Sequence, residues 1–177
     1  MDRWLYRSRQ FFGALLGRVQ AVEMAEARHV LGPSLYSIFA SMPGQYRRHA
    51  LAVYRRVRAS GCGDPHILQA ALLHDAGKYD PVSGRYVTIP HRVVIVLLKV
   101  TPMGKRLLRK LARPSPQGVF GLLLYPFYLS QHHAEMGARL AAERDAPQEV
   151  VELIAHHHRH DHISAGLRTL QVADEES

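Results

Sequence analysis

Cysteine is nearly absent from this chain, and long apolar runs are missing altogether. Cys62 is the only cysteine, which excludes an internal disulfide and a zinc site built from several thiolates, and fits a reducing compartment. The longest apolar runs, 93–98 and 119–125, are far shorter than the roughly 20 residues that span a bilayer. Arginines interrupt the N-terminal stretch, which therefore lacks the apolar region of a secretory signal. The sequence predicts a soluble, cytoplasmic protein.

Acidic residues are also scarce relative to basic ones. The chain has 15 Asp and Glu against 23 Lys and Arg, a formal net charge of +8 with neutral histidines. Such a surface attracts anions, whether phosphate esters, nucleic acid or acidic lipid. Histidine, by contrast, is abundant: there are 12, and five of the seven positions from 156 to 162 are histidine. A length of 177 residues suits one domain with a real core, in which this histidine cluster needs an explanation.

The apolar periodicity predicts an all-α fold. Helical spacing recurs over 45–60, 65–75, the residues after Pro126, 148–158 and the residues after Ser164. Further helices are expected over 1–20 and 21–42, the second broken near Gly32-Pro33. Segment 91–100 fits a strand or a buried helix, and helix is favoured because its neighbours are helical. Gly61 should end one helix, while Asp64 caps the next and Pro65 opens it.

Residues 104–113 form a short basic amphipathic pattern. We interpret it as a packed helix with a solvated charged face. The alternatives are that its cations steer an anionic substrate or contact anionic lipid. The sequence leaves these alternatives open.

The stretch AALLHDAGK at 70–78 carries the strongest chemical signal. Helical spacing places Asp75 on the stripe that should face the core. A buried carboxylate is tolerated when it is paired or coordinates a metal, and the adjacent His74 offers the commonest side-chain metal ligand. Gly77 is expected to end the helix. Lys78 beyond it could complement the helix dipole, but beside a metal it would bind phosphate, and that reading is favoured.

Two further candidate ligands lie far from this stretch in the sequence. His49 falls on the apolar stripe of the 45–60 helix, where a hydrogen-bonded core histidine is the alternative. Asp174 shares a stripe with Leu167 and Leu170 in the last helix, where a frayed acidic tail is the alternative. Each residue alone has an ordinary structural explanation.

The histidine pairs and clusters can be separated by their helical position. His133 lies on an apolar stripe, whereas His132 shares its stripe with charged residues. His157 follows the apolar face of the 148–158 helix, His158 lies on the edge of that face, and His156 lies on the polar side. His160 and His162 lie beyond this helix and could simply be solvated. His133 and His157 are therefore the best candidates here, with His158 next.

A helical bundle would bring these side chains together at one interior site. One metal could be held by His49, His74, Asp75 and Asp174. A second could be held by His133 with His157 or His158, with Asp75 bridging the two ions. Mixed nitrogen and oxygen ligands suit one or two divalent ions such as Mn, Fe, Co or Mg rather than a metal selected by thiolates.

The order His49, His74-Asp75, Asp174 resembles the HD superfamily of metal-dependent phosphohydrolases over about residues 45–175. HisAspAlaGlyLys at 74–78 is similar to the HD-x-GK stretch of that family. The added histidines at 133, 157 and 158 resemble the extra ligands of its binuclear branches, among them the HD-GYP phosphodiesterases and the YqeK-type dinucleoside tetraphosphate hydrolases. The Gly-Tyr-Pro triplet is absent after His158, which argues against a cyclic dinucleotide as substrate.

The resemblance implies an HD-domain helical bundle over 41–177 with its metal site between core helices, and residues 1–40 as a helical extension packed on it. The implied activity is hydrolysis of a nucleotide or other small phosphate ester by a metal-activated hydroxide. In that activity Asp75 anchors the ions and Lys78 neutralises phosphate charge. The alternatives are a di-iron oxygenase of the same superfamily and a non-catalytic regulatory module that binds anions. Nucleic acid and an anionic membrane surface are less favoured partners.

Overall fold

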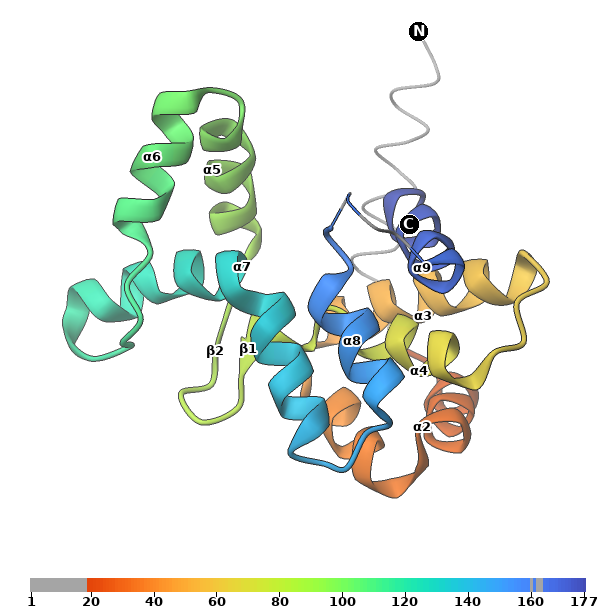
Figure 1. The fold of residues 1–177 in the computed structure, drawn as a ribbon. Helices are drawn as coiled ribbons and strands as arrows, with labels where there is room; N and C mark the ends of the chain where they lie inside the picture. The colour runs from red at the N-terminus through yellow and green to blue at the C-terminus, as the bar shows by residue number, and fades with distance from the viewer. Residues whose placement is uncertain (1–18, 160, 162–163) are drawn as a thin grey trace, which may run out of the picture.

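The computed structural model describes residues 19–159, 161 and 164–177, and within them the chain is all-α (Figure 1). The predicted helix over 1–20 lies largely outside the described residues, as do His160 and His162. None of the described helices is long and apolar enough to cross a membrane. The α-helices are α2 (Ala21–Ser41), α3 (Gly44–Ala59), α4 (Pro65–Leu73), α5 (Ile89–Lys99), α6 (Pro102–Leu111), α7 (Gly118–Ala142), α8 (Gln148–His156) and α9 (Ala165–Glu175).

The main core lies where α2, α3, α4, α8, α9 and the C-terminal half of α7 pack together (Figure 1). These elements form a bundle around one continuous apolar cluster. Burial of such side chains is the largest favourable contribution to folding. Its largest fully buried apolar members are Phe39, Tyr46, Leu51, Tyr54, Leu72, Leu73, Ile154 and Leu170.

The predicted helix boundaries are confirmed where capping chemistry marks them. The Asp64 side chain accepts hydrogen bonds from the first turn of α4, and Pro65 is the first residue of that helix. The Ser164 side chain caps α9 in the same way. Gly61 follows α3 with a φ of 85°, the left-handed conformation that ends helices at glycine. The predicted break in α2 is present at Gly32, whose φ is 67°.

The end of α4 differs from its prediction. The α-helix stops at Leu73, and Asp75 has φ −99° and ψ 4° before a 3-10 turn, η1 (Ala76–Lys78). Gly77 was expected to end the helix, but the helix has already ended at Leu73, and Gly77 is not among the glycines with positive φ. It is needed for another reason: a Cβ there would overlap the carbonyl oxygen of His133 and lie 2.6 Å from the nitrogen of Gly137. The two glycines allow the backbones of η1 and α7 to touch.

Pro126 was expected to precede a helix and instead lies inside α7. Proline removes one backbone donor and usually kinks a helix. Here its side chain is buried, so packing compensates for the lost hydrogen bond. The helix starts earlier than predicted, at Gly118.

A short hairpin follows η1 and was not predicted. Strand β1 (Tyr79–Asp80) pairs antiparallel with β2 (Arg85–Tyr86). The hydroxyl of Tyr46 in α3 donates to the Val87 carbonyl, and the hydroxyl of Tyr125 in α7 donates to the Asp80 carboxylate at 3.0 Å. Burial and the Asp80 carboxylate raise the pKa of Tyr125 to about 12, so this hydroxyl keeps its proton. The hairpin is therefore held from two helices.

Residues 89–124 form a second unit, here called the basic lobe, that extends away from the bundle (Figure 1). It contains α5, α6 and the first turns of α7, and segment 91–100 is helical as predicted. A separate, smaller apolar cluster includes Ile95, Leu108 and Tyr125. The long helix α7 runs from the basic lobe into the bundle (Figure 1).

Because Gly77 packs directly against the backbone of Gly137, we expect that no side chain fits at position 77. We expect Gly77→Ala to separate η1 from α7 and to reduce the free energy of unfolding by about 3 kcal/mol. Gly63→Ala is the control, because no heavy atom lies within 4 Å of a Cβ at Gly63, and it should change stability by less than about 1 kcal/mol. Urea unfolding of both variants measures the difference. Equal midpoints would contradict the proposed packing role.

Candidate metal centre

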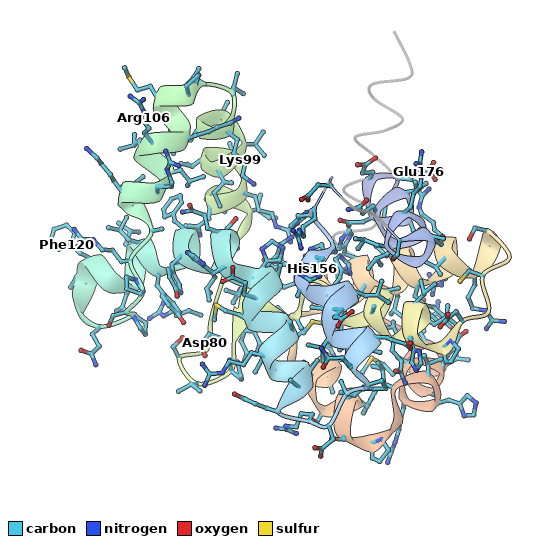
Figure 2. The ribbon with its side chains drawn as sticks, in the orientation of Figure 1. Asp80, Lys99, Arg106, Phe120, His156 and Glu176 are labelled. Carbon is cyan, nitrogen blue, oxygen red and sulfur yellow. The ribbon has the colours of Figure 1, made fainter. Side chains whose placement is uncertain are left out.

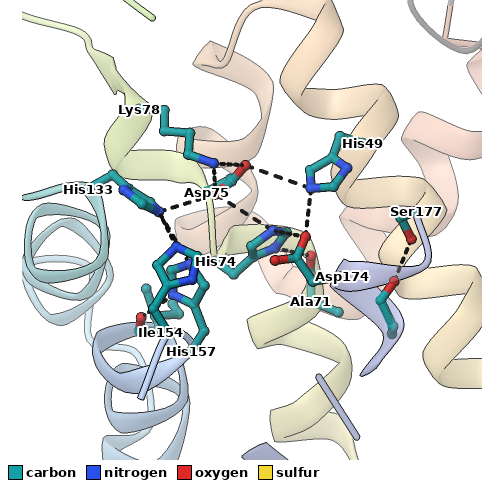
Figure 3. A network of polar contacts seen from close by, with 12 residues as sticks. His49, Ala71, His74, Asp75, Lys78, His133, Ile154, His157, Asp174 and Ser177 are labelled. Atoms are coloured by element: carbon teal, nitrogen blue, oxygen red, sulfur yellow. Dashed lines mark hydrogen bonds and ion pairs between the residues drawn. The ribbon is translucent and has the colours of Figure 1, made fainter. Parts of the chain in front are cut away.

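Five elements of the bundle bring polar side chains to one interior point (Figure 3). The residues come from α3, the α4–η1 junction, α7, the end of α8, and α9. They are His49, His74, Asp75, Lys78, His133, His157, His158 and Asp174. Residues separated by more than 120 positions in the chain thus meet, as the bundle hypothesis predicts.

The first set of possible ligands, here called the Asp174 group, consists of His49, His74 and Asp174. Their ligand atoms all lie within 4.8 Å of one another. Oδ1 of Asp174 is 2.9 Å from Nε2 of His49 and 3.4 Å from Nε2 of His74. His74 is fully buried, whereas the side chains of His49 and Asp174 are 26% and 24% exposed. The group is therefore anchored in the core and open to solvent on one side.

The second set, here called the three-histidine group, consists of His133, His157 and His158. Nε2 of His133 is 3.3 Å from Nε2 of His157 and 3.0 Å from Nε2 of His158. These atoms also satisfy the 4.8 Å spacing that one metal ion requires. His133 and His157 are buried, so three ring nitrogens converge at the edge of the core.

Asp75 lies between the two groups (Figure 3). One carboxylate oxygen, Oδ1, is 3.7 Å from Nε2 of His74 and 3.5 Å from Nε2 of His133. The other, Oδ2, is 3.7 Å from Nε2 of His49. Nζ of Lys78 lies 2.7 Å from Oδ1 and 2.8 Å from Oδ2. A single carboxylate can thus reach ligand atoms of both groups, while one ammonium balances its charge.

Three of the imidazoles are oriented by the helices that carry them. Nδ1 of His74, His133 and His157 lies 3.0, 2.9 and 2.7 Å from the carbonyl oxygen three residues earlier in the chain. Because a carbonyl oxygen only accepts hydrogen bonds, each Nδ1 carries the proton, and a neutral ring then has its lone pair on Nε2. Fixing the tautomer in this way is characteristic of metal-ligating histidines.

The electrostatics of the two groups differ. Burial lowers the pKa of His74, but the carboxylates of Asp75 and Asp174 outweigh this and raise it above its ordinary value. Burial and the Lys78 ammonium lower the pKa of His133 and His158. The Asp174 group therefore attracts positive charge, and the second group offers neutral imidazoles near pH 7.

The carboxylates themselves are held ionised. Burial would raise the pKa of Asp75, but Lys78 and the surrounding histidines hold it well below its usual value. Burial opposes ionisation of Asp174 as well, but its hydrogen bond with His49 and the imidazole of His74, 3.4 Å away, lower its pKa. Two carboxylates and several neutral imidazoles form the donor set of a divalent cation site.

Two observations test whether a cation fits this arrangement. Nε2 of His74 is buried and has no hydrogen-bond partner among the described residues, and such an orphaned atom costs free energy unless something binds it. Nε2 of His133 and Nε2 of His157 face each other at 3.3 Å although each is the acceptor nitrogen of a neutral ring. A cation between these lone pairs would turn repulsion into coordination. The residues present therefore fit a metal ion.

The structure places all seven sequence-predicted metal ligands in this cluster and leaves the predicted outward histidines out. His132 is 41% exposed and pairs with Glu135, and His156 lines a separate surface cavity. Both His157 and His158, the two alternatives at this position, belong to the three-histidine group. Lys78 was predicted to contact substrate phosphate, but here its partner is Asp75.

Sequence reasoning missed the residues that orient the ligands. The carbonyl partners of His74, His133 and His157 lie three positions upstream of each ligand, a spacing that helix geometry could have supplied. Gln171 was also missed: its side-chain amide donates to the carbonyl of His157 at 3.1 Å. No sequence pattern marks that contact.

Two adjacent histidines provide a matched test of the metal centre. We expect His133→Ala to weaken Mn²⁺ or Co²⁺ affinity by about 100-fold or more, because it removes one of the three ring nitrogens of the three-histidine group. His132→Ala should leave affinity unchanged. Isothermal titration calorimetry measures both, and the metal-dependent increase in the thermal midpoint gives a second readout. An equal loss in the two variants would mean that these ions bind elsewhere.

Comparison of this chain with protein-family models, with curated proteins and with solved structures finds no match.

Proposed function

We propose that the chain is a metal-dependent phosphohydrolase that cleaves a nucleotide or another small phosphate ester in the cytoplasm. Residues 41–177 would form its HD-type catalytic domain. The observation that carries the proposal is the position of Asp75, one carboxylate within 4 Å of ligand atoms in two separate groups. Paired metal sites that share a ligand recur in phosphatases and nucleases.

The donor set guides the choice of metal. Imidazole nitrogens and carboxylate oxygens without thiolate suit Mn, Fe or Co, and Mg where carboxylates dominate. The Asp174 group together with Asp75 supplies both nitrogen and oxygen ligands, whereas the three-histidine group supplies nitrogen ligands alone. We therefore propose two divalent ions, with a transition metal at the three-histidine group. Ions held there supply Lewis-acid chemistry, activating water and neutralising phosphoryl oxygens.

An anionic substrate is favoured by the cations near the centre. The side chain of Lys78 is 21% exposed, so its ammonium can meet a molecule arriving from solvent. Burial first, and then the positive fields of Lys78 and Lys105, lower the pKa of Lys99. Three ammonium groups thus lie close enough to interact, and such a concentration of positive charge attracts phosphate.

In the proposed reaction, some residues of the chain would form the walls of the site, and Lys78 would neutralise charge on the substrate. His49 and Asp174 form the solvent-facing side, where a substrate would enter. His74 and Asp75 are buried, and charge interactions are stronger in the interior than in water. Lys78, already fixed beside the carboxylate, would donate to a phosphoryl oxygen as charge develops in the transition state. No proton transfer through Lys78 is required.

The HD-superfamily resemblance supports the same reaction class. The order of His49, His74-Asp75 and Asp174 is the order expected of that superfamily, and all four side chains lie in one cluster. The added histidines favour a binuclear branch. The resemblance rests on the order of the residues in the sequence, so their convergence in space is a separate line of support.

Two substitutions distinguish metal binding from substrate handling. We expect Asp75→Asn to remove bound metal and turnover together, because it weakens ligation in both groups. Lys78→Gln should keep the metal and lower kcat/KM by about 100-fold, the usual cost of losing one donor to a developing oxyanion. Nucleotides and nitrophenyl phosphate mono- and diesters, assayed with Mn²⁺, Fe²⁺ and Mg²⁺, measure activity, and elemental analysis measures metal content.

Oxygen dependence separates hydrolysis from the di-iron alternative. Turnover with Mn²⁺ under anaerobic conditions is expected of a phosphohydrolase. A product that forms only with Fe²⁺ and O₂ would assign the site to an oxygenase. An Asp75→Asn variant that retains both metal and activity would refute the proposed site.

A further inference from the structure

The positive charge of this protein is concentrated in one segment. From residue 81 to residue 134 the chain contains no Asp or Glu, while it contains eight Lys and Arg. All 15 acidic residues of the chain lie outside this segment, where they balance the remaining basic residues, so the segment accounts for the entire net charge of +8. The basic lobe, residues 89–124, lies within it.

Among residues 19–159, 161 and 164–177, the cations of α6 in the basic lobe have no acidic partners. Arg106, Arg109 and Lys110 of α6 are exposed, and they form no ion pair within the described part of the chain. In the bundle, by contrast, Arg55 and Arg56 of α3 each pair with a glutamate. The basic lobe therefore presents an uncompensated positive surface.

The same lobe exposes large apolar side chains in helical register. On α5, Ile89, Val93, Val96 and Val100 follow one another at intervals of three or four residues, and they are 47%, 54%, 63% and 76% exposed. Only Ile95 of this helix is buried. The outward face of α5 is therefore aliphatic, which is unusual for a helix in contact with water alone.

The apolar exposure continues beyond α5 onto the neighbouring helices. Met103 at the start of α6 is 80% exposed, and Phe120 in the first turn of α7 is 79% exposed. Figure 2 shows Arg106 and Phe120 on the basic lobe, away from His156 and Glu176 of the bundle. Most of the exposed large apolar residues among those described belong to this lobe. Apolar and cationic side chains thus coexist on one projecting unit.

We propose that the basic lobe docks on the surface of an anionic lipid bilayer. Aliphatic and aromatic side chains would enter the boundary between headgroups and acyl chains, as they do in helices that lie in the membrane plane. The exposed cations would interact with anionic headgroups. Because none of the described helices can span a bilayer, the association is peripheral.

Charge argues for lipid over the other possible occupants. A symmetric contact with a second copy would place two acid-free, cationic surfaces against each other, and like charges across an interface are costly. Nucleic acid would satisfy the arginines through its phosphates but would leave the aliphatic face of α5 in water. An anionic bilayer complements both features.

Vesicle binding by the full chain tests the proposal without reference to catalysis. Vesicles of phosphatidylcholine alone are compared with vesicles that also contain phosphatidylglycerol. We expect binding only to the second kind, with an affinity that falls as salt is raised. Co-sedimentation over a range of lipid concentrations gives the partition coefficient.

Two substitutions, each with a matched control, separate the apolar and charged contributions. Phe120→Ala should weaken partitioning by about tenfold because it removes an exposed aromatic side chain that would enter the bilayer. Its control, Val22→Ala, changes an apolar residue of the bundle that is 68% exposed, and should have no effect. Arg106→Glu should weaken partitioning by about tenfold or more, whereas the same charge reversal at exposed Arg168 of α9 should not.

Four results would overturn the proposal. One is the absence of binding to phosphatidylglycerol vesicles. Another is a wild-type partition coefficient in both Phe120→Ala and Arg106→Glu. The third is a dimer in light scattering that Phe120→Ala converts to monomer, which would assign the face to a second copy. Duplex DNA binding that Arg106→Glu abolishes, without vesicle binding, would assign it to nucleic acid.

Discussion

The buried carboxylate of Asp75 is the constraint on which the rest of the site depends. A charge in the core costs several kcal/mol unless it is compensated, and here compensation comes from Lys78, from the adjacent His74, and from histidines on α7 and α3. His133 and His49, which are distant in the sequence, must be brought to this point by tertiary packing. The bundle is thus arranged around an anion as well as around its apolar core, and removing one partner would leave the others badly placed.

Close backbone packing makes this convergence possible. Gly77 and Gly137 let η1 approach α7 at the level of His133, so that Asp75 and His133 come within 3.5 Å. Larger residues at either position would move the two ligand groups apart. The same packing buries His74 and leaves its Nε2 without a hydrogen-bond partner in the described part of the chain. The apolar core and the polar centre therefore both require the backbones of η1 and α7 to pack closely.

Periodicity predicted much of this architecture because the relevant signals are local. Helical spacing separated His133 from His132 and placed Asp174 inward, and capping chemistry located Asp64 and Ser164. Other features depend on contacts that no local pattern encodes. Asp75 lies outside the α-helix because the chain must turn to meet α7, and Pro126 is accommodated within α7 by burial. The pairing of Lys78 with Asp75, by contrast, joins residues three positions apart.

The hairpin that follows Lys78 has a consequence for how an anion would be received. One residue beyond the lysine, the backbone enters β1, and hydroxyls from Tyr46 and Tyr125 hold this hairpin at two points. The ammonium is further restrained by both oxygens of Asp75. Its conformational freedom is therefore lost when the protein folds rather than when a ligand arrives. A preorganised charge of this kind binds with little entropic penalty, so the flexibility usual for a surface lysine has been removed before substrate is encountered.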